Sequence, residues 1–569
     1  MWARSSNVKT LLKNAFVVNV FTDEVEKKNV LLENDRILGV GDYKDSDADK
    51  VRDLSGKFIC PGLIDGHIHI ESTMMIPYEL ARVCLPHGTT AIVADPHEIA
   101  NVCGKTGIDY MMQASAGLPM DVFFTASSCV PATPFDETGA VMHAPDLIDL
   151  YNNPRVLGLA EMMNFPGVVN KDPDVIRKIR DARAFGKVVD GHAPLLHGKD
   201  LDAYVSAGVQ SDHECSNMDE AVEKLKRGQY IMIREGTAAK NLKDLIGLFS
   251  PKYSHRCLLV TDDSHPTDLL NLGHIDKIIR FAATLGVDPV IAVRMASLQA
   301  AEYFRIPDTG AVAPGYIANL TIVDDLKLFH VTDVYSHGKI AVKNGELIEF
   351  DPPMVDMDLE MKVRDTFHVS PITAESFKLS EENGICRVIE LIPGQIITKE
   401  THEEIRFDKN SGIDVERDIL KLAVIERYKG TGHIGIGFIK GIGMKAGAIA
   451  SSVSHDSHNI IVIGTSDEEM AAAANKIISM GGGNVVIKDG KDIARMALPI
   501  GGLMSDFSAK DTAGFNARVR NAVYELGTSR DVEPFMNMAF VSLPVIPALK
   551  MSTQGLVDVT TFSRVPLKV

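Results

Sequence analysis

Two histidines separated by one residue, His67 and His69, stand just after an apolar run that extends from Phe58 to Ile64. In an extended chain, side chains two residues apart point to the same side, so both imidazoles can face one point. Two imidazoles at a strand end can bind one divalent metal ion from adjacent corners. The pair also fits a strand end that carries two solvated histidines, so this motif alone does not decide between the hypotheses.

Residue types that bind metals also follow several later apolar runs. These runs and the residues after them are 156–160 with Glu161, 187–190 with His192, 207–211 with His213, and 257–261 with Asp262. Unrelated strand ends would seldom supply this set of imidazole and carboxylate groups, which suit zinc, iron and manganese. The combination therefore predicts a metal centre.

The elements that must position these residues alternate short apolar runs with helical segments. This pattern indicates parallel strands joined by crossover helices. The strand candidates are 58–64, 89–94, 122–126, 156–160, 187–190, 207–211, 230–233 and 257–261. Eight such units within about 250 residues predict a (β/α)₈ barrel, whose active site lies at the carboxyl ends of its strands.

Two β-rich segments flank the predicted barrel at 58–309, and a third region follows it. We expect residues 1–57 and 310–360 to form one composite β-sandwich. Residues 361–569 follow the prolines 352–353 and are predicted to form an extra α/β domain. Its predicted strands are 386–398, 420–426, 447–453 and 459–464. In this region Ser466 and Glu469 form a capping-box pattern, which predicts a helix that ends at Gly481.

Composition and charge limit the classes of function. The chain has 569 residues, so it needs several domains, and its net charge of −17 disfavours nucleic-acid and anionic-membrane surfaces. Its seven cysteines form no CxxC pair, which favours free thiols in a reducing cytosol. With no signal-peptide pattern and no long apolar run, we expect a cytoplasmic protein with a small-molecule substrate. We also expect a homo-oligomer, either a dimer or a tetramer.

Several of these segments resemble a known family. The segment PGLIDGHIHIES at 61–72, the acidic Glu161, the single histidines His192 and His213, and TDDSHP at 261–266 resemble the amidohydrolase superfamily. The likeness is closest to the adenine deaminase family of bacteria and archaea. It spans nearly the whole chain, including SHDSHNIIVIGT at 454–465. Glu161 stands where many binuclear amidohydrolases carry a carboxylated lysine.

The resemblance implies two divalent metal ions, most closely Mn²⁺, with Fe²⁺ and Zn²⁺ left open. One ion would be held by His67, His69 and Asp262. The other would be held by His192 and His213, and Glu161 would bridge the two ions. A hydroxide between the metals would attack adenine at C6 and yield hypoxanthine and ammonia for purine salvage. Asp262 would move the proton.

Other polar residues near the mouth of the predicted barrel are further candidates for the active site. Two of them, Glu235 and His265, have two alternative roles each. Glu235 is predicted to contact purine nitrogens or to move a proton, with pairing to Arg234 as the alternative. His265 is predicted to polarise a substrate group, with capping of its loop as the alternative. Candidates for substrate contacts or for partners of the ligands are Asp95, His97, Glu98, Asp263, His455, Asp456 and His458.

Two alternative functions are considered. A related amidohydrolase could act on a cyclic amide or an N-acetyl substrate, although Glu161 and the long C-terminal region weigh against the hydantoinase-like branch. A non-catalytic assembly subunit would predict a lost ligand, and the sequence retains each of the implied ligands. The sequence therefore favours a hydrolase that acts on a C–N bond of a cyclic amidine.

Overall fold

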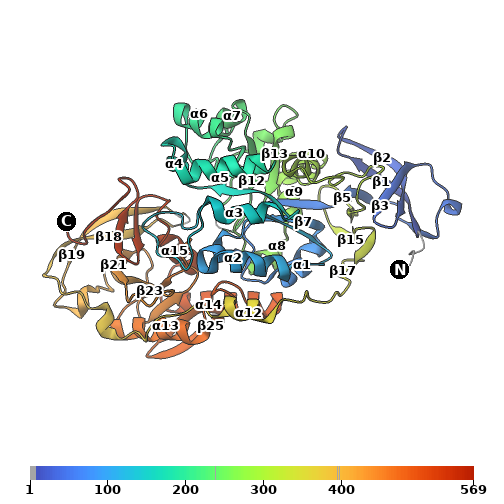
Figure 1. Ribbon diagram of the computed structural model, residues 1–569. Coiled ribbons are helices and arrows are strands. Elements are labelled where there is room, and N and C mark those ends of the chain that lie inside the picture. The colour runs from blue at the N-terminus through green and yellow to red at the C-terminus, as the bar shows by residue number, and fades with distance from the viewer. Residues whose placement is uncertain (1–7, 238, 394, 396) are drawn as a thin grey trace.

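The computed structural model describes residues 8–237, 239–393, 395 and 397–569 (Figure 1). The parts of the predicted ranges that fall on residues 1–7, 238, 394 and 396 lie outside the described residues. Three bodies lie side by side in Figure 1: an N-terminal sheet at the right, a barrel in the middle and a C-terminal α/β body at the lower left.

The barrel consists of parallel strands whose side chains are almost all buried. Its strands are β6 (Leu63–Ile68), β7 (Thr89–Ala94), β8 (Asp121–Ala126), β9 (Val156–Met162), β10 (Val188–Gly191), β11 (Ser211–Asp212), β12 (Tyr230–Arg234) and β13 (Cys257–Val260). Strands β6 to β10 pair in parallel, as do β11 to β13, and a parallel bridge between Ile68 and Asp262 brings the first and last strands together. The predicted α/β barrel is confirmed, and its carboxyl-end loops meet at one mouth.

Helices cover the outside of this barrel and connect its strands (Figure 1). They are α1 (Pro77–Cys84), α2 (His97–Ala114), α3 (Ala144–Tyr151), α4 (Phe165–Val169), α5 (Pro173–Ala184), α6 (Gly198–Ala207), α7 (Met218–Lys226), α8 (Pro266–Leu272), α9 (Ile275–Thr284), α10 (Pro289–Met295) and α11 (Leu298–Phe304). Helix α2 begins at His97, immediately beyond strand β7. Its first residues therefore lie at the barrel mouth.

The predicted strand 58–64 is wrong as a single element. Strand β5 (Phe58–Pro61) pairs with β1 (Lys9–Asn19) and β14 (Leu320–Val323) of the flanking sheet, and the barrel strand β6 starts only at Leu63. Between them, a Cβ on Gly62 would lie 2.2 Å from Thr90 Oγ1. The apolar run continues through this change of sheet, so hydrophobic pattern alone could not detect it.

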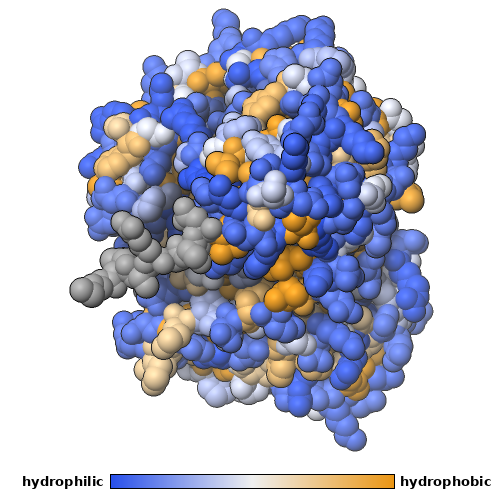
Figure 2. All heavy atoms as spheres, turned by 90° about the vertical axis from the view of Figure 1, so that its right-hand side faces the viewer, coloured by the Kyte–Doolittle hydropathy of each residue, from blue (hydrophilic) through white to orange (hydrophobic). Residues whose placement is uncertain are grey.

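The flanking sheet draws strands from both sides of the barrel sequence. Its order is β17-β16-β15-β14-β5-β1-β2-β3, with β4 paired to β1. The remaining strands are β2 (Glu24–Glu33), β3 (Arg36–Gly41), β4 (Lys50–Asp53), β15 (Val331–Ser336), β16 (Lys339–Lys343) and β17 (Glu346–Leu347). Viewed from this side, the surface is mainly hydrophilic with a limited hydrophobic band (Figure 2).

The C-terminal body contains an eight-stranded sheet with the order β19-β18-β21-β20-β23-β22-β24-β25. Its strands are β18 (Gly384–Leu391), β19 (Thr398–Ile405), β20 (Leu420–Ile425), β21 (Ile434–Lys440), β22 (Ala448–Ser451), β23 (Ile460–Gly464), β24 (Gly483–Lys488) and β25 (Lys491–Ala497). Other elements are α12 (Met357–Arg364), α13 (Asp467–Met480), α14 (Ala509–Glu525), α15 (Pro534–Val541), β26 (Leu549–Ser552), β27 (Gly555–Asp558) and β28 (Ser563–Arg564).

Some elements of the C-terminal body agree with the predictions from sequence, and one does not. Helix α13 confirms the predicted helix and its ends, because the Ser466 side chain accepts the Glu469 N–H at 3.3 Å and Gly481 ends the helix with a φ of +68°. The reciprocal half of the capping box is not formed by Glu469 Oε2, which has no hydrogen-bond partner among the described residues. The predicted strand 386–398 is wrong as one element, since β18 and β19 are separate antiparallel strands. Strand β18 (GICRVIEL) is rich in apolar residues, whereas β19 (TKETHEEI) is mainly polar, so hydrophobic pattern indicates the first strand and not the second.

The C-terminal body packs against the barrel mouth. The Ser505 N–H donates to the Met74 carbonyl at 2.8 Å, and the Ala509 N–H at the start of α14 donates to Glu79 at 2.8 Å. The mouth of the barrel is therefore an interface between two folded bodies.

In the described part of the chain, no helix combines the length and apolar character that a membrane span requires.

Candidate metal centre and active site

The first group of predicted ligands meets at the buried barrel mouth. His69 Nε2 lies 3.2 Å from Asp262 Oδ1 and 3.4 Å from Glu161 Oε1. His67 Nε2 lies 3.9 Å from Asp262 Oδ1 and 4.0 Å from Glu161 Oε1. Strands β6, β9 and β13 thus direct two imidazole nitrogens and two carboxylate oxygens toward a common point.

The second group faces the other oxygen of Glu161. Glu161 Oε2 lies 2.7 Å from His192 Nδ1 and 3.2 Å from His213 Nε2, and these two nitrogens are 3.3 Å apart. The two oxygens of one carboxylate therefore face two different pairs of histidines. This is the arrangement that a carboxylate bridging two cations requires.

The unpaired atoms and hydrogen bonds of the first pair fit a divalent metal. Among the described residues, the buried His67 Nε2 has no hydrogen-bond partner. His69 Nδ1 lies 3.1 Å from the Asp95 carbonyl oxygen, to which it can only donate. In the neutral imidazole that a metal ligand requires, His69 Nε2 then carries the lone pair. Imidazoles and carboxylates together suit first-row divalent ions.

Arg234 is a residue of this site whose function the sequence did not reveal. Its Nη1 donates to Asp262 Oδ2 at 2.6 Å, and Nη2 donates to Glu214 Oε2 at 2.7 Å. Burial acts to raise the pKa of Asp262, but the Arg234 charge and the contacts with His69 and His213 together outweigh it and hold that pKa well below its usual range. Asp262 is therefore ionised within a closed site.

The neighbouring Glu235 does not share this position. Arg234 is the last residue of β12 and lines the cavity with the ligands, whereas Glu235, which follows the strand, is not among the residues that line it. Burial raises the pKa of Glu235, and the charges of Lys240 and Lys277 act in the opposite direction. The sequence could have indicated a role for Arg234, because this residue lies at a predicted strand end and the neighbouring strand ends carry carboxylates. The catalytic role of Glu235 stays a prediction.

Two buried aspartates hold the ligand-bearing loops. Asp65 Oδ1 accepts the N–H groups of His67 at 3.2 Å and Thr261 at 3.1 Å, which ties the first strand to the last. Asp212 Oδ1 accepts the Ala193 N–H at 2.8 Å, beside His192. Asp65 and Asp212 therefore hold the backbone next to the candidate ligands in place. Their carboxylates have a structural role and are not among the candidate metal ligands.

The Asp212 carboxylate depends on a fully buried lysine. Lys224 Nζ lies 2.9 Å from Asp212 Oδ2 and 2.9 Å from Glu220 Oε1, and its side chain is 0% exposed. Lys224→Met is expected to destabilise the barrel by about 3–5 kcal/mol, because it leaves two buried carboxylates without their cation. Urea denaturation followed by circular dichroism measures this loss.

The exposed Lys105→Met is the matched control for that variant. Lys105 and Asp109 form a solvent-exposed pair on α2, with side chains 47% and 39% exposed. Such pairs contribute about 0–1 kcal/mol, so the unfolding midpoint should hardly change. Equal midpoints for both lysine variants would refute the structural importance of Lys224.

The other predicted residues divide between two cavities. His97, Glu98, Asp263, His455 and Asp456 line the cavity that contains the candidate ligands. Two further candidates lie behind its wall: the side chains of Asp95 and His458 contact His97 and Glu98, respectively.

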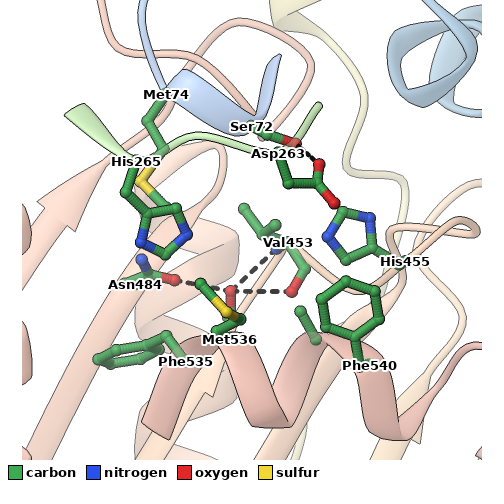
Figure 3. A pocket seen from close by; sticks show the side chains of 12 residues that line it. Ser72, Met74, Asp263, His265, Val453, His455, Asn484, Phe535, Met536 and Phe540 are labelled. Carbon is green, nitrogen blue, oxygen red and sulfur yellow. Dashed lines mark hydrogen bonds between the residues drawn. The ribbon is translucent and has the colours of Figure 1, made fainter. Parts of the chain in front are cut away.

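A second, neighbouring cavity lies between the barrel rim and the C-terminal body (Figure 3). Figure 3 shows His265 above Asn484, and Asp263 next to His455. Burial lowers the pKa of His265 to about 4, so its imidazole is neutral near pH 7. Asp263, His455 and Phe540 line both cavities and form the partition between them. The catalytic role of His265 stays a prediction.

Comparison with known proteins agrees with both halves of this arrangement. The model of the amidohydrolase family matches residues 58–367, and that of the adenine deaminase C-terminal domain matches residues 395–563. A protein from Desulfatibacillum aliphaticivorans named adenine deaminase is 46% identical over 98% of this chain and 96% of its own length. A protein from Carboxydothermus hydrogenoformans named adenine deaminase 2 is 44% identical over 98% of this chain and 97% of its own length.

These matches run through the barrel and the C-terminal body alike, and the amidohydrolase model alone covers more than half of the sequence. Family and relatives imply dependence on divalent metal, and the clusters of buried histidines and carboxylates offer the ligands for it. The chain belongs to the adenine deaminase family of the amidohydrolase superfamily.

Proposed function

We propose that this protein hydrolyses adenine at C6, so that adenine and water yield hypoxanthine and ammonia. The observation that carries the proposal is the near-complete match to relatives named adenine deaminase, which includes both the barrel and the C-terminal domain. Deamination of a free base fits a role in purine salvage. We also propose that the enzyme acts in the cytoplasm as a dimer or tetramer.

The proposed metal centre holds two divalent ions, with Mn²⁺ preferred and Fe²⁺ or Zn²⁺ as alternatives. The proposed ligands are those implied by the sequence: His67, His69 and Asp262 for one ion, His192 and His213 for the other, and Glu161 between them. Support comes from the two oxygens of Glu161, which face different pairs of histidines. Bound divalent ions would supply Lewis acidity and make water a nucleophile near neutral pH.

We assign proton transfer to Asp262. Its Oδ1 faces the two histidines of the first pair, while Arg234 holds its Oδ2 at 2.6 Å. We propose that Oδ1, the oxygen that Arg234 does not hold, accepts a proton from the attacking water and passes it to the purine ring or the leaving amine, in addition to its place among the proposed ligands. Arg234 orients this carboxylate and keeps it ionised.

The C-terminal domain is proposed to exclude bulk water from the reaction. Apolar side chains from this domain line the cavity opposite the ligands: Phe540, Leu543, Val545 and Ile546. A closed apolar wall strengthens the electrostatic interactions inside a site. It also offers a surface against which a flat purine ring can pack.

Ammonia release from adenine tests the function directly. Protein supplied with Mn²⁺ is expected to form one hypoxanthine and one ammonia for each adenine consumed, followed by chromatography and an ammonia assay. Parallel samples with Fe²⁺ and Zn²⁺ rank the metals. A hydantoin and an N-acetyl sugar serve as matched substrates for the alternative amidohydrolase activity, and their turnover without that of adenine would contradict the proposal.

A further inference from the structure

We propose that Asp456 of the C-terminal domain binds adenine by accepting a hydrogen bond from the N–H of its imidazole ring. This inference rests on the proposed function and names a residue that recognises the substrate across the domain interface. It gives the C-terminal domain a direct part in the active site, beyond that of a cover.

The Asp456 side chain is buried, and one of its oxygens lacks a partner. Asp456 lines the same cavity as His69, Glu161 and Asp262, although it comes from the loop between β22 and β23. The residue is 4% exposed, and Oδ2 has no hydrogen-bond partner among the described residues. Burying such an oxygen without a donor costs about 1–3 kcal/mol or more for a charged group, and a ligand N–H would offset that cost.

The loop that carries Asp456 is fastened to the barrel by Glu98. His455 Nδ1 lies 2.6 Å from Glu98 Oε1, and His458 Nε2 contacts Glu98 Oε2. The Ser454 N–H donates to His458 Nδ1 at 3.2 Å, so His458 carries its proton on Nε2 and donates it to Glu98. A protonated nitrogen cannot bind a metal, so His458 does not serve as a metal ligand here. Glu98, His455 and His458 instead form a hydrogen-bonded clamp.

Further contacts hold the same loop on both sides. The Asn459 side-chain amide donates to the Glu137 carbonyl of the barrel at 2.7 Å. His455 also stacks on Phe540, with ring centroids 4.7 Å apart, and Figure 3 shows this pair beside Asp263. Asp456 thus has a fixed position, which a substrate-binding carboxylate needs.

The position of His97 indicates which part of adenine meets Asp456. His97 Nδ1 lies 3.6 Å from Glu161 Oε1, and its Nε2 lies 3.7 Å from Asp456 Oδ1. The imidazole ring of His97 therefore lies between Asp456 and the candidate bridging carboxylate and contacts both. A carboxylate only accepts hydrogen bonds, and adenine offers an amino group and one ring N–H. The amino group leaves from C6 at the ligand cluster, so the ring N–H remains for Asp456.

Asp456→Asn and Asp456→Ala test this inference with adenine and 9-methyladenine, which lacks the N9–H. KM for adenine is expected to rise about 10- to 100-fold in both variants, since a hydrogen bond to a charged group is lost. The inhibition constant of 9-methyladenine should change by less than about threefold, because that ligand has no such N–H to donate. Metal content, measured by plasma mass spectrometry, should equal that of the wild type.

Asp136→Asn is the matched control. Asp136 Oδ2 accepts the Thr133 hydroxyl at 2.7 Å, and Asp136 lies outside the lining of the ligand cavity. This variant should keep the wild-type KM for adenine. An unchanged KM in the Asp456 variants, or an equal rise in KM and in the inhibition constant, overturns the inference while the proposed function stands. A wild-type enzyme that releases no ammonia from adenine overturns both.

Discussion

Glu161→Gln is expected to lower kcat for adenine by at least about 100-fold and to reduce the metal bound per chain. Removing a group that merely hydrogen-bonds to a metal ligand costs about 10- to 100-fold, and removing a proposed ligand itself should cost more. The two Glu161 oxygens face separate histidine pairs at 2.7 to 4.0 Å. Glutamine has one such oxygen and no charge, and its NH₂ group would point toward one of the two cations. Metal analysis after desalting and steady-state ammonia release measure both effects.

Glu71→Gln is the matched control for this variant. Glu71 is buried next to the mouth, its Oε1 accepts the Ile99 N–H at 3.1 Å, and burial raises its pKa to about 7. An amide can replace the protonated form of this carboxyl, which is substantially populated near neutral pH. Glu71→Gln should therefore bind as much metal as the wild type. A fully metallated and active Glu161→Gln enzyme would contradict the bridging role.

Much of the fold and the candidate ligands could be predicted because the relevant signals are local. Most barrel strands are short apolar runs, and ligands such as Glu161 and Asp262 come at a carboxyl end or within two residues of it. Strand β11 (Ser211–Asp212) is the exception, since the predicted strand 207–211 overlaps it only at Ser211. Parallel strands bring these ends to one mouth, so sequence order translates into spatial proximity. The capped helix from Ser466 to Gly481 was predictable for the same reason, since its start and stop signals lie at its own two ends.

The features that could not be predicted depend on direction or on contacts across long stretches of chain. Arg234 lines the cavity and Glu235 does not, and this choice depends on the register of β12, in which a shift of one residue would exchange the two sides. The clamp between Glu98 and His455 joins residues 357 positions apart. No local pattern specifies such a pairing, so the sequence offered His455, Asp456 and His458 as candidates without indicating which residues they contact.

These two kinds of feature correspond to two tasks in the proposed reaction. The barrel supplies the ligands and the proton acceptor from strand ends, whose geometry is set by the sheet. The C-terminal domain supplies the apolar wall and Asp456, whose geometry is set by the interface. Variants of the first kind should therefore change kcat and metal content, whereas variants of the second kind should change KM.

Asp262→Asn tests the proton-transfer assignment. It is expected to lower kcat by about 10²- to 10⁴-fold, the usual contribution of a general base, with a smaller change in KM. The introduced amide would keep the shape of the side chain but could neither accept a proton nor pair with the Arg234 charge. Asp190→Asn is the control, since Asp190 lies inside the barrel, where it accepts the Ser211 hydroxyl at 3.0 Å. Assays with excess Mn²⁺ separate lost metal from lost proton transfer, and a rate restored by Mn²⁺ would refute the assignment of the base.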